Sequence, residues 1–344
     1  MSLENLTIVI PTYNRHPYAI RLMRFWSKYR AIVHVLDGTN DPISIDVLKE
    51  FDNTNVRYHH LPIPIEDRFG RAAELVNTPY VVLLCDDEFF IPSALENCIK
   101  FLESHDDYVA CIGRTLGFYP SKRGITAFPQ YLAMKNYKIE GNSPEERMIA
   151  HMQHYVPSSF YAVQRVSVWK NTMRLVSTRK DKFSCPYVPE LQMELSTSFQ
   201  GKSVVIEDLM WLRNKENPPI NNSSHNLKIG IDIWFAEPRY KDEVDFFYNT
   251  TAAILAKIDN MKSTDAVRES VHQAIKIYFS SIKHPSFIQK LLSRVLPAGL
   301  KRALKGWKTI MEAVQDMQRS GVHVDTRQLQ EIIEYMKNVP TLNT

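Results

Sequence analysis

Three consecutive acidic residues follow a short apolar segment, and side chains of this type and spacing could hold a metal ion. Residues 80–85 are six apolar or aromatic positions in a row, and Asp86, Asp87 and Glu88, called the acidic triplet below, follow directly. Such a run predicts a strand buried on both faces of a sheet. Adjacent carboxylates repel one another unless a cation, an arginine or water separates them. Because ligands gather beyond the carboxyl ends of strands in α/β sheets, we expect a hard metal ion that carries substrate phosphates.

The acidic triplet also suits a second interpretation, the opening of a helix. Pro92 and Ser93 follow shortly after it. Acidic residues are favourable in the first turn of a helix, and proline is favoured at a helix start. These residues alone leave both interpretations open.

Length and composition predict a globular protein of one large domain with an appendage, or of two domains. The chain has 344 residues, of which 44% are hydrophobic and 23% charged. No apolar run approaches the roughly 18 residues that cross a bilayer, and residues 1–6 lack a basic leader, so we expect a cytoplasmic location. Its four cysteines form no CxxC pair, which indicates reduced structural thiols.

Apolar strands and helical periodicities alternate through the first half of the chain, which predicts an α/β fold with a largely parallel sheet and helices on both faces. Residues 115–159 are irregular and rich in aromatic residues, proline and histidine, so we expect a long loop that forms a lid or substrate wall. The expected strands are residues 6–10, 32–36, 56–61, 80–85, 108–113 and 203–206, and the expected helices are 19–26, 47–51, 69–76, 95–102 and 190–199.

Beyond residue 229 the hydrophobic periodicity is helical throughout. A polar loop at residues 214–224, full of Asn, Ser and Pro, precedes this part. We therefore expect two regions, an α/β domain over residues 1–228 and an all-helical C-terminal region over residues 229–344.

The order of four motifs resembles that of the family 2 glycosyltransferases, whose fold is called GT-A. A first strand ends in Pro-Thr-Tyr-Asn-Arg at residues 11–15, a second in Asp37-Gly38, a third strand follows, and the fourth ends in the acidic triplet. The resemblance covers residues 4–225. It implies transfer of a sugar from a nucleotide-diphosphate donor to a hydroxyl of a glycan or glycolipid acceptor, with inversion at the anomeric carbon.

The resemblance also implies which residues hold the donor. A tyrosine can stack on a pyrimidine and a carboxylate can accept from an imide N–H, which favours uracil and a UDP-sugar. The simpler alternatives are a helix cap at Thr12 and Asn14, a turn at Asp37-Gly38, and exposed arginines. The implied contacts are Pro11, Thr12, Tyr13 and Arg15 to the base and ribose, Asp37 to the base, and Arg68, Arg71, Asp86 and Arg213 to the rest of the donor.

For the metal, the resemblance places Asp87 at the usual coordinating position, with Asp86 inside the motif and Glu88 beside it. It implies Mn²⁺ or Mg²⁺, which would bridge the two phosphates. Cys85 departs from the pattern, because many members carry the first Asp of the motif there. His225, in a later loop, is a candidate further ligand, and a solvated histidine is the alternative.

The resemblance implies a catalytic base on the acceptor side, at the start of a helix about eleven residues before a glycine. Counting back from Gly201 leads to Glu190, where Pro189-Glu190-Leu191 replaces the usual Glu-Asp pair. A structural role competes, because proline and glutamate both suit a helix start. Glu194, one turn later on the same face, is the reserve candidate.

Positive charge is concentrated near the C-terminus. Residues 283–308 contain seven Lys and Arg and no acidic residue, which leaves 35 basic against 38 acidic residues elsewhere. Together with the apolar residues of 283–311, this pattern suits peripheral contact with the inner face of a membrane, where lipid-linked acceptors lie. Packing on the chain's own domain or within a homo-oligomer gives the same pattern. No nucleic-acid-binding module is recognisable.

Two rival functions remain open. A sugar-phosphate nucleotidyltransferase has a similar architecture but opens with a glycine-rich phosphate loop, and residues 11–15 contain no glycine. A degenerate domain that binds a sugar nucleotide or a partner without turnover is kept open by Cys85 and Pro189, which depart from the family pattern.

Overall fold

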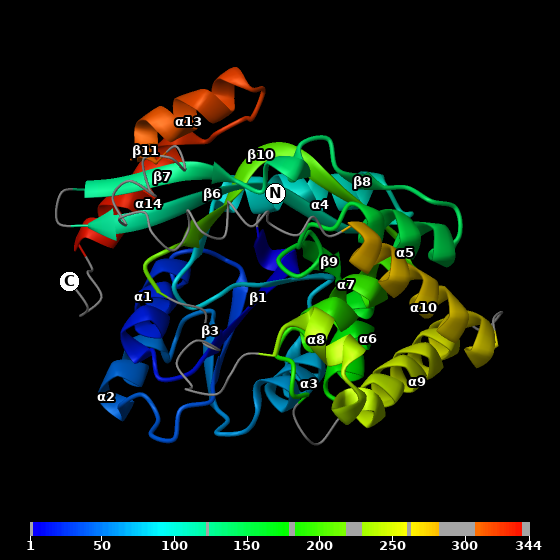
Figure 1. The fold of residues 1–344 in the computed structure, drawn as a ribbon. Coiled ribbons are helices and arrows are strands. Elements are labelled where there is room, and N and C mark those ends of the chain that lie inside the picture. The colour runs from blue at the N-terminus through cyan, green and yellow to red at the C-terminus, as the bar shows by residue number, and fades with distance from the viewer. Residues whose placement is uncertain are drawn as a thin grey trace, which may run out of the picture.

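The chain forms a curled mixed sheet flanked by helices (Figure 1). The computed structural model describes residues 3–121, 124–178, 183–217, 229–259, 263–281 and 307–338. The α/β class predicted from the sequence is confirmed.

The first half of the chain builds the parallel part of the sheet. Its strands lie in the order β4-β1-β2-β3, and β1 is buried at every position because its side chains meet helices on both faces. Parallel pairing brings the carboxyl ends of these strands to one edge. The elements are η1 (Leu3–Asn5), β1 (Leu6–Thr12), α1 (His16–Trp26), β2 (Ile32–Asp37), α2 (Ile45–Leu48), η2 (Lys49–Phe51), β3 (Val56–His60), α3 (Ile65–Leu75) and β4 (Tyr80–Leu83).

The second half adds mainly antiparallel strands. The long strand β6 pairs with β7 and β9 in antiparallel fashion and with β10 in parallel, while β4 pairs with β9. Two short strands, β5 and β8, pair with β10. The elements are β5 (Phe89–Phe90), α4 (Pro92–Ser104), β6 (Tyr108–Ser121), β7 (Gly124–Gln130), η3 (Leu132–Met134), β8 (Lys138–Ile139), α5 (Pro144–Gln153), β9 (Val163–Arg165), α6 (Val166–Val176), α7 (Val188–Gln200) and β10 (Lys202–Asn214).

The prediction of a long loop over residues 115–159 is wrong. This stretch holds the end of β6, all of β7 and β8, and helix α5. Its strand pattern is hard to recognise because Gly113 and Gly117 interrupt β6 and Pro129 lies in β7. The pairing of β6 with β10, roughly ninety residues away in the chain, stabilises a strand that local propensity does not predict.

The helical C-terminal region is confirmed, and it packs on two separate parts of the α/β fold (Figure 1). Helices α9 and α10 share a hydrophobic core with α5 and α7, whereas α13 and α14 join the core around the sheet. The side chain of Tyr335 donates a hydrogen bond of 2.7 Å to the Arg21 carbonyl. The elements are α8 (Ile231–Ala236), η5 (Pro238–Tyr240), α9 (Lys241–Ile258), α10 (Thr264–Ser281), β11 (Lys308–Thr309), α13 (Ile310–Arg319) and α14 (Thr326–Asn338).

Two expectations about this region stay predictions. The boundary between residues 228 and 229 falls at the end of a segment outside the described residues, and so does most of the basic stretch at 283–311. Within the part of the chain that the structure describes, no helix has the length and apolar character needed to cross a membrane.

Candidate active site

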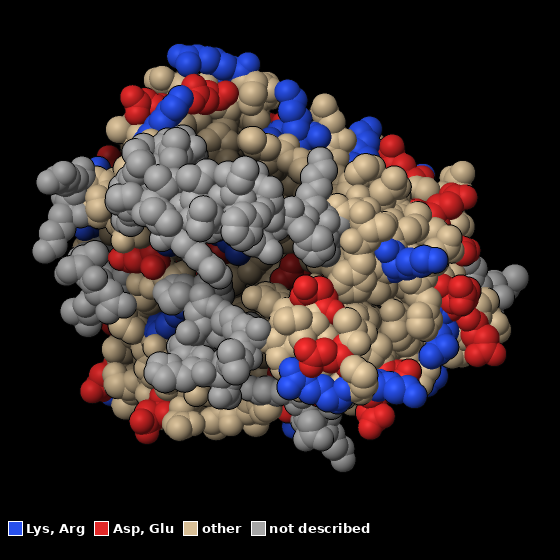
Figure 2. Space-filling view, viewed as in Figure 1, with Lys and Arg blue, Asp and Glu red and all other residues tan. Residues whose placement is uncertain are grey.

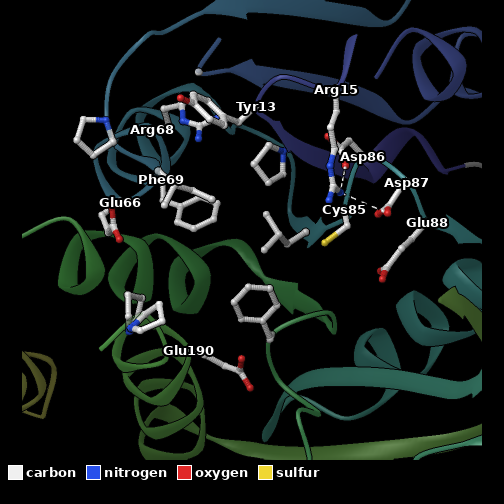
Figure 3. A pocket seen from close by; sticks show the side chains of 18 of the residues that line it. Tyr13, Arg15, Glu66, Arg68, Phe69, Cys85, Asp86, Asp87, Glu88 and Glu190 are labelled. Carbon is white, nitrogen blue, oxygen red and sulfur yellow. Dashed lines mark hydrogen bonds and ion pairs between the residues drawn. The ribbon is translucent and has the colours of Figure 1, made fainter. Parts of the chain in front are cut away.

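A cleft of about 1140 Å³ lies at the carboxyl ends of the parallel strands. Its walls come from the ends of β1, β2, β4 and β10 and from the N-terminal ends of α3 and α7. In the space-filling view, acidic side chains lie inside a hollow near the centre of the face shown (Figure 2). The acidic triplet and Glu190 line the same cleft, on different elements (Figure 3).

The acidic triplet lies at the end of β4 with its carboxylates buried. The Thr12 hydroxyl donates to Asp86 Oδ2 at 2.7 Å, and Arg15 Nη1 lies 3.4 Å from both Asp86 Oδ1 and Asp87 Oδ2. Burial and the negative charge of Asp87 nevertheless raise the pKa of Asp86 to about 7. Ionisation of this corner is therefore unfavourable with Arg15 alone, and a further cation beside it would favour the charged carboxylates.

The remaining contacts of the triplet come from the end of β10 and from Asn217 just after it. Trp211 Nε1 donates to Glu88 Oε2 at 2.6 Å, and Arg213 Nε lies 3.6 Å from Glu88 Oε1. Burial and the charge of Asp87 raise the pKa of Glu88 to about 8. Asn217 Nδ2 donates to Asp87 Oδ2 at 2.9 Å. The helix-start interpretation of the triplet is wrong, because α4 begins only at Pro92 and has no acidic residue in its first turn.

The described residues of this corner would hold a divalent cation together with substrate phosphates, not by themselves. Among the described residues, no group of three or more His, Cys, Asp or Glu side chains could hold a metal ion by itself. Mg²⁺ is more often held by one or two carboxylates together with substrate phosphates. Asp87 suits that arrangement, because within the described chain no hydrogen bond reaches its Oδ1. His225 lies outside the described residues, so its predicted ligand role is untested.

Cys85 lies beside the triplet in the cleft wall. Its Sγ is 3.1 Å from the hydroxyl of Tyr161, and burial raises the pKa of the thiol well above its usual value. The thiol is therefore neutral and packs as a small apolar group. Residue 85 therefore offers no charged side chain to a metal ion.

The residues predicted to hold a nucleotide fall into two groups. Pro11, Tyr13, Arg15 and Arg68 line the cleft, and Tyr13 is 42% exposed (Figure 3). Arg71 does not line it, because its side chain is exposed on α3 and pairs with Glu74. Asp37 is completely buried and lies behind the wall.

Arg68 is a buried cation at the edge of the cleft. Its Nη1 donates to the carbonyls of Thr12 and Leu36 at 2.6 and 2.8 Å, which ties the ends of β1 and β2 together. Its Nε has no hydrogen-bond partner among the described residues. Gly38 is needed beside it, because a Cβ at this residue would lie 2.6 Å from Arg68 Cζ.

Replacing Gly38 by Ala should therefore lower the free energy of unfolding by about 1–3 kcal/mol, because the added Cβ displaces the Arg68 guanidinium from its two carbonyl acceptors. Chemical denaturation measures the change. In an Arg68→Ala background the same substitution should cost far less, because the clashing group is gone. An equal loss in both backgrounds would show that the contact with Arg68 does not limit residue 38.

The two carboxylates considered on the acceptor side have different surroundings. Glu190, in the first turn of α7, lines the cleft and accepts a hydrogen bond of 2.7 Å from the Tyr155 hydroxyl. Burial raises the pKa of Glu190, the Tyr155 hydrogen bond lowers it, and the charge of Glu194 raises it further. A half-buried carboxylate of raised pKa that faces a cleft is suited to accept a proton.

Glu194 does not reach the cleft. It is fully buried, accepts from the backbone N–H groups of Ser159 and Phe160 at 3.0 to 3.2 Å, and lies 2.8 Å from His151 Nε2. The prediction of Glu194 as a reserve base is therefore corrected, since its oxygens are occupied and shielded from any acceptor. Its contacts hold the segment that carries Phe160 and Tyr161, which do line the cleft.

The sequence interpretation missed four side chains that contact the predicted site residues. Two come from the irregular segment between α5 and β9, Tyr155 and Tyr161, and two from the end of β10 and just beyond it, Trp211 and Asn217. No local signal marks the first two. The polar composition after Arg213 could have indicated Asn217.

Comparisons with known proteins agree with this geometry. The family model described as glycosyl transferase family 2 matches residues 7–166. The crystal structure of S. aureus TarS 1-349 in complex with UDP-GlcNAc resembles this chain with a TM-score of 0.51 at 14% identity, over 91% of this chain and 80% of that chain. The structure of TarS 1-349 with UDP has a TM-score of 0.49 at 14% identity, over 87% and 77%. No curated protein matches the chain. The first likeness confirms the GT-A fold.

Proposed function

Since residues 7–166 of this glycosyltransferase belong to glycosyl transferase family 2, we propose that the chain transfers a sugar from a UDP-sugar to a hydroxyl of a glycan or lipid-linked acceptor. One observation carries the proposal. A single cleft has a buried acidic corner with Arg15 at the end of β4 and a half-buried carboxylate, Glu190, on α7. The choice of uracil is supported by the UDP-GlcNAc bound to TarS.

Each part of the donor has a chemically suitable surface in the cleft. Tyr13, exposed at one end, offers a ring on which a base can stack. Arg15 and Arg213 offer cationic donors near the acidic triplet for the diphosphate oxygens. Asp87 is the carboxylate best placed to hold Mn²⁺ or Mg²⁺ with those phosphates, and the ion would offset negative charge on the departing nucleotide.

The transfer itself requires one proton acceptor. The acceptor oxygen forms a bond to the anomeric carbon while the bond from that carbon to the phosphate oxygen breaks, and its electron pair leaves with UDP. Glu190 takes the hydroxyl proton as the oxygen attacks, which increases the nucleophilicity of the oxygen at the required moment. Attack from the side opposite the leaving group inverts the anomeric configuration.

Tyr155 should set the pH at which Glu190 works. Its hydrogen bond lowers the pKa of Glu190, so Tyr155→Phe should raise that pKa, because the charged form of the carboxylate loses a donor. Because the base must be ionised, activity is lost as pH falls through this pKa, and the acid limb of the kcat/KM profile should move to higher pH.

A pH series of kcat/KM measures this shift. Tyr278→Phe is the matched control, because Tyr278 packs against the Tyr155 ring with centroids 5.1 Å apart but, in the part of the chain that the structure describes, donates no hydrogen bond to Glu190. In the control, the acid limb of the kcat/KM profile should stay at the wild-type pH. If Tyr155→Phe shows the wild-type pH profile, Glu190 is not the base.

Release of UDP from UDP-sugars, measured with Mn²⁺ and then with EDTA, tests the proposed function. Release that depends on the metal and on an added acceptor supports it. Tight binding of UDP-sugars without turnover against a panel of glycan and lipid-linked acceptors would favour the rival function of a binding module. Failure to bind any nucleotide sugar would contradict both.

A further inference from the structure

The loops that follow β1 and β2 run side by side along one end of the cleft. Gly38 N–H donates to the Thr12 carbonyl at 3.0 Å, and Asn14 N–H donates to the Thr39 hydroxyl at 2.8 Å. These two bonds place Tyr13 and Asn40, each next to a bonded residue, on the same wall. Both side chains are exposed, and both line the cleft.

Asp37, the residue implied by family resemblance to pair with the base, is not available to a ligand. Its side chain is 0% exposed. Its Oδ2 accepts from the Tyr58 hydroxyl at 2.6 Å and lies 2.8 Å from His16 Nε2, while Oδ1 accepts from Thr39 N–H at 2.9 Å. These donors hold the pKa of Asp37 below its usual value, despite its burial. A base could reach this carboxylate only after several hydrogen bonds break.

Asn40 has the chemistry that Asp37 cannot offer. Its amide provides an acceptor oxygen and a donor nitrogen side by side. The edge of uracil presents the complementary pair, an N3–H donor beside a carbonyl acceptor. Pro62, Ile63 and Pro64, which line the same end after β3, have no side-chain hydrogen-bonding group. A base stacked on Tyr13 therefore has the Asn40 amide as a polar partner that can both accept and donate, whereas the neighbouring Arg68 guanidinium can only donate.

Given the proposed function, on which this inference rests, we propose that Asn40 recognises the edge of the donor base and that Asp37 is a positioning residue. Asp37 accepts from Thr39 N–H, and the Thr39 hydroxyl accepts from Asn14 N–H, so one network fixes the backbone beside both Tyr13 and Asn40. The specificity of the site for its nucleotide thus depends on an exposed amide that has no counterpart in the motif implied by resemblance.

Calorimetric titration with UDP and with UDP methylated at N3 tests this assignment. Methylation removes the N3–H group from which the Asn40 amide oxygen would accept a hydrogen bond. The wild-type protein should therefore bind the methylated nucleotide about tenfold or more weakly. Asn40→Ala should weaken UDP binding by a similar factor and reduce the methylation penalty to less than about threefold. Its melting temperature should stay unchanged, because the side chain is exposed.

Asp37→Asn is the contrasting variant. It should lower the melting temperature, since a buried acceptor of three hydrogen bonds is replaced, while the ratio of the two affinities stays that of wild type. A penalty abolished in Asp37→Asn and retained in Asn40→Ala would overturn the inference. If Asp37→Asn does not fold, the Asn40→Ala titration decides alone.

The outcome also separates this inference from the proposed function. A wild-type chain that binds no UDP contradicts the proposed function itself. A wild-type chain that binds UDP, with Asn40→Ala retaining both the affinity and the methylation penalty, contradicts only the role of Asn40.

Discussion

Replacing Glu190 by Gln should reduce kcat by about 10² to 10⁴-fold, the range that a positioned general base contributes. The amide has nearly the shape of the carboxylate and can still accept from Tyr155, so the fold of α7 should persist. It cannot take the acceptor proton. Because the acidic triplet lies on another element, the dissociation constant of UDP should stay within about twofold of wild type, and the loss should appear in turnover.

Glu66→Gln is the matched control for this experiment. Glu66 also lines the cleft, from the first turn of α3, and Figure 3 shows it apart from both the triplet and Glu190. A loss of turnover confined to Glu190→Gln supports the assignment of the base. Wild-type turnover in Glu190→Gln would refute it, whatever the behaviour of the control.

Replacing Asp87 by Asn should lower kcat/KM by at least about 100-fold, comparable to removal of one electrostatic contact to a developing charge. Among the described residues, no hydrogen bond occupies Asp87 Oδ1, so this oxygen is open to a further ligand, and Asn removes the negative charge while keeping the shape. The dissociation constant of UDP should also lose its dependence on Mn²⁺. Calorimetry with Mn²⁺ and with EDTA measures that dependence.

Asp46→Asn provides the control for removal of one carboxylate. Asp46 is exposed on α2 and pairs only weakly with Lys49 in a surface ion pair, so its removal should change neither kinetics nor metal dependence. If UDP binding by Asp87→Asn still depends on Mn²⁺, the ion binds at Asp86, at Glu88 or at another part of the chain.

The sequence predicts the parallel half of this fold well, because its strands are continuous apolar runs that need no partner to be recognised. The strand that begins at Leu6 and the one that begins at Tyr80 are both buried on each face, and their ends bring Arg15 beside Asp86. The acidic corner of the site follows from these local patterns. The hairpin of β6 and β7 does not, because it depends on pairing with β10.

The acceptor side shows a different limit. Helix α7 is buried along most of its length, including polar residues such as Ser196 and Thr197, so it has no clear amphipathic stripe. Sequence spacing alone places Glu190 and Glu194 on one face. Only the packing of α5 and of the segment before β9 against α7 encloses Glu194, while Glu190 at the helix start still faces the cleft.

Burial of Asp37 has a similar origin. The side chains that cover it, His16 and Tyr58, come from α1 and β3, more than twenty residues away on either side. A motif places a carboxylate at the end of a strand, but it does not specify whether the neighbouring elements leave that carboxylate exposed. A role assigned to a residue from a family motif therefore has to be checked against the exposure of its side chain.

A crystal structure of the chain with UDP and Mn²⁺ tests the central claim most directly, namely that the cleft between the acidic triplet and Glu190 holds the donor. We expect the uracil against Tyr13, the diphosphate and the ion at Asp87, and the Glu190 carboxylate facing the space beyond the diphosphate. An empty cleft at saturating UDP, or UDP bound elsewhere on the chain, would contradict the account.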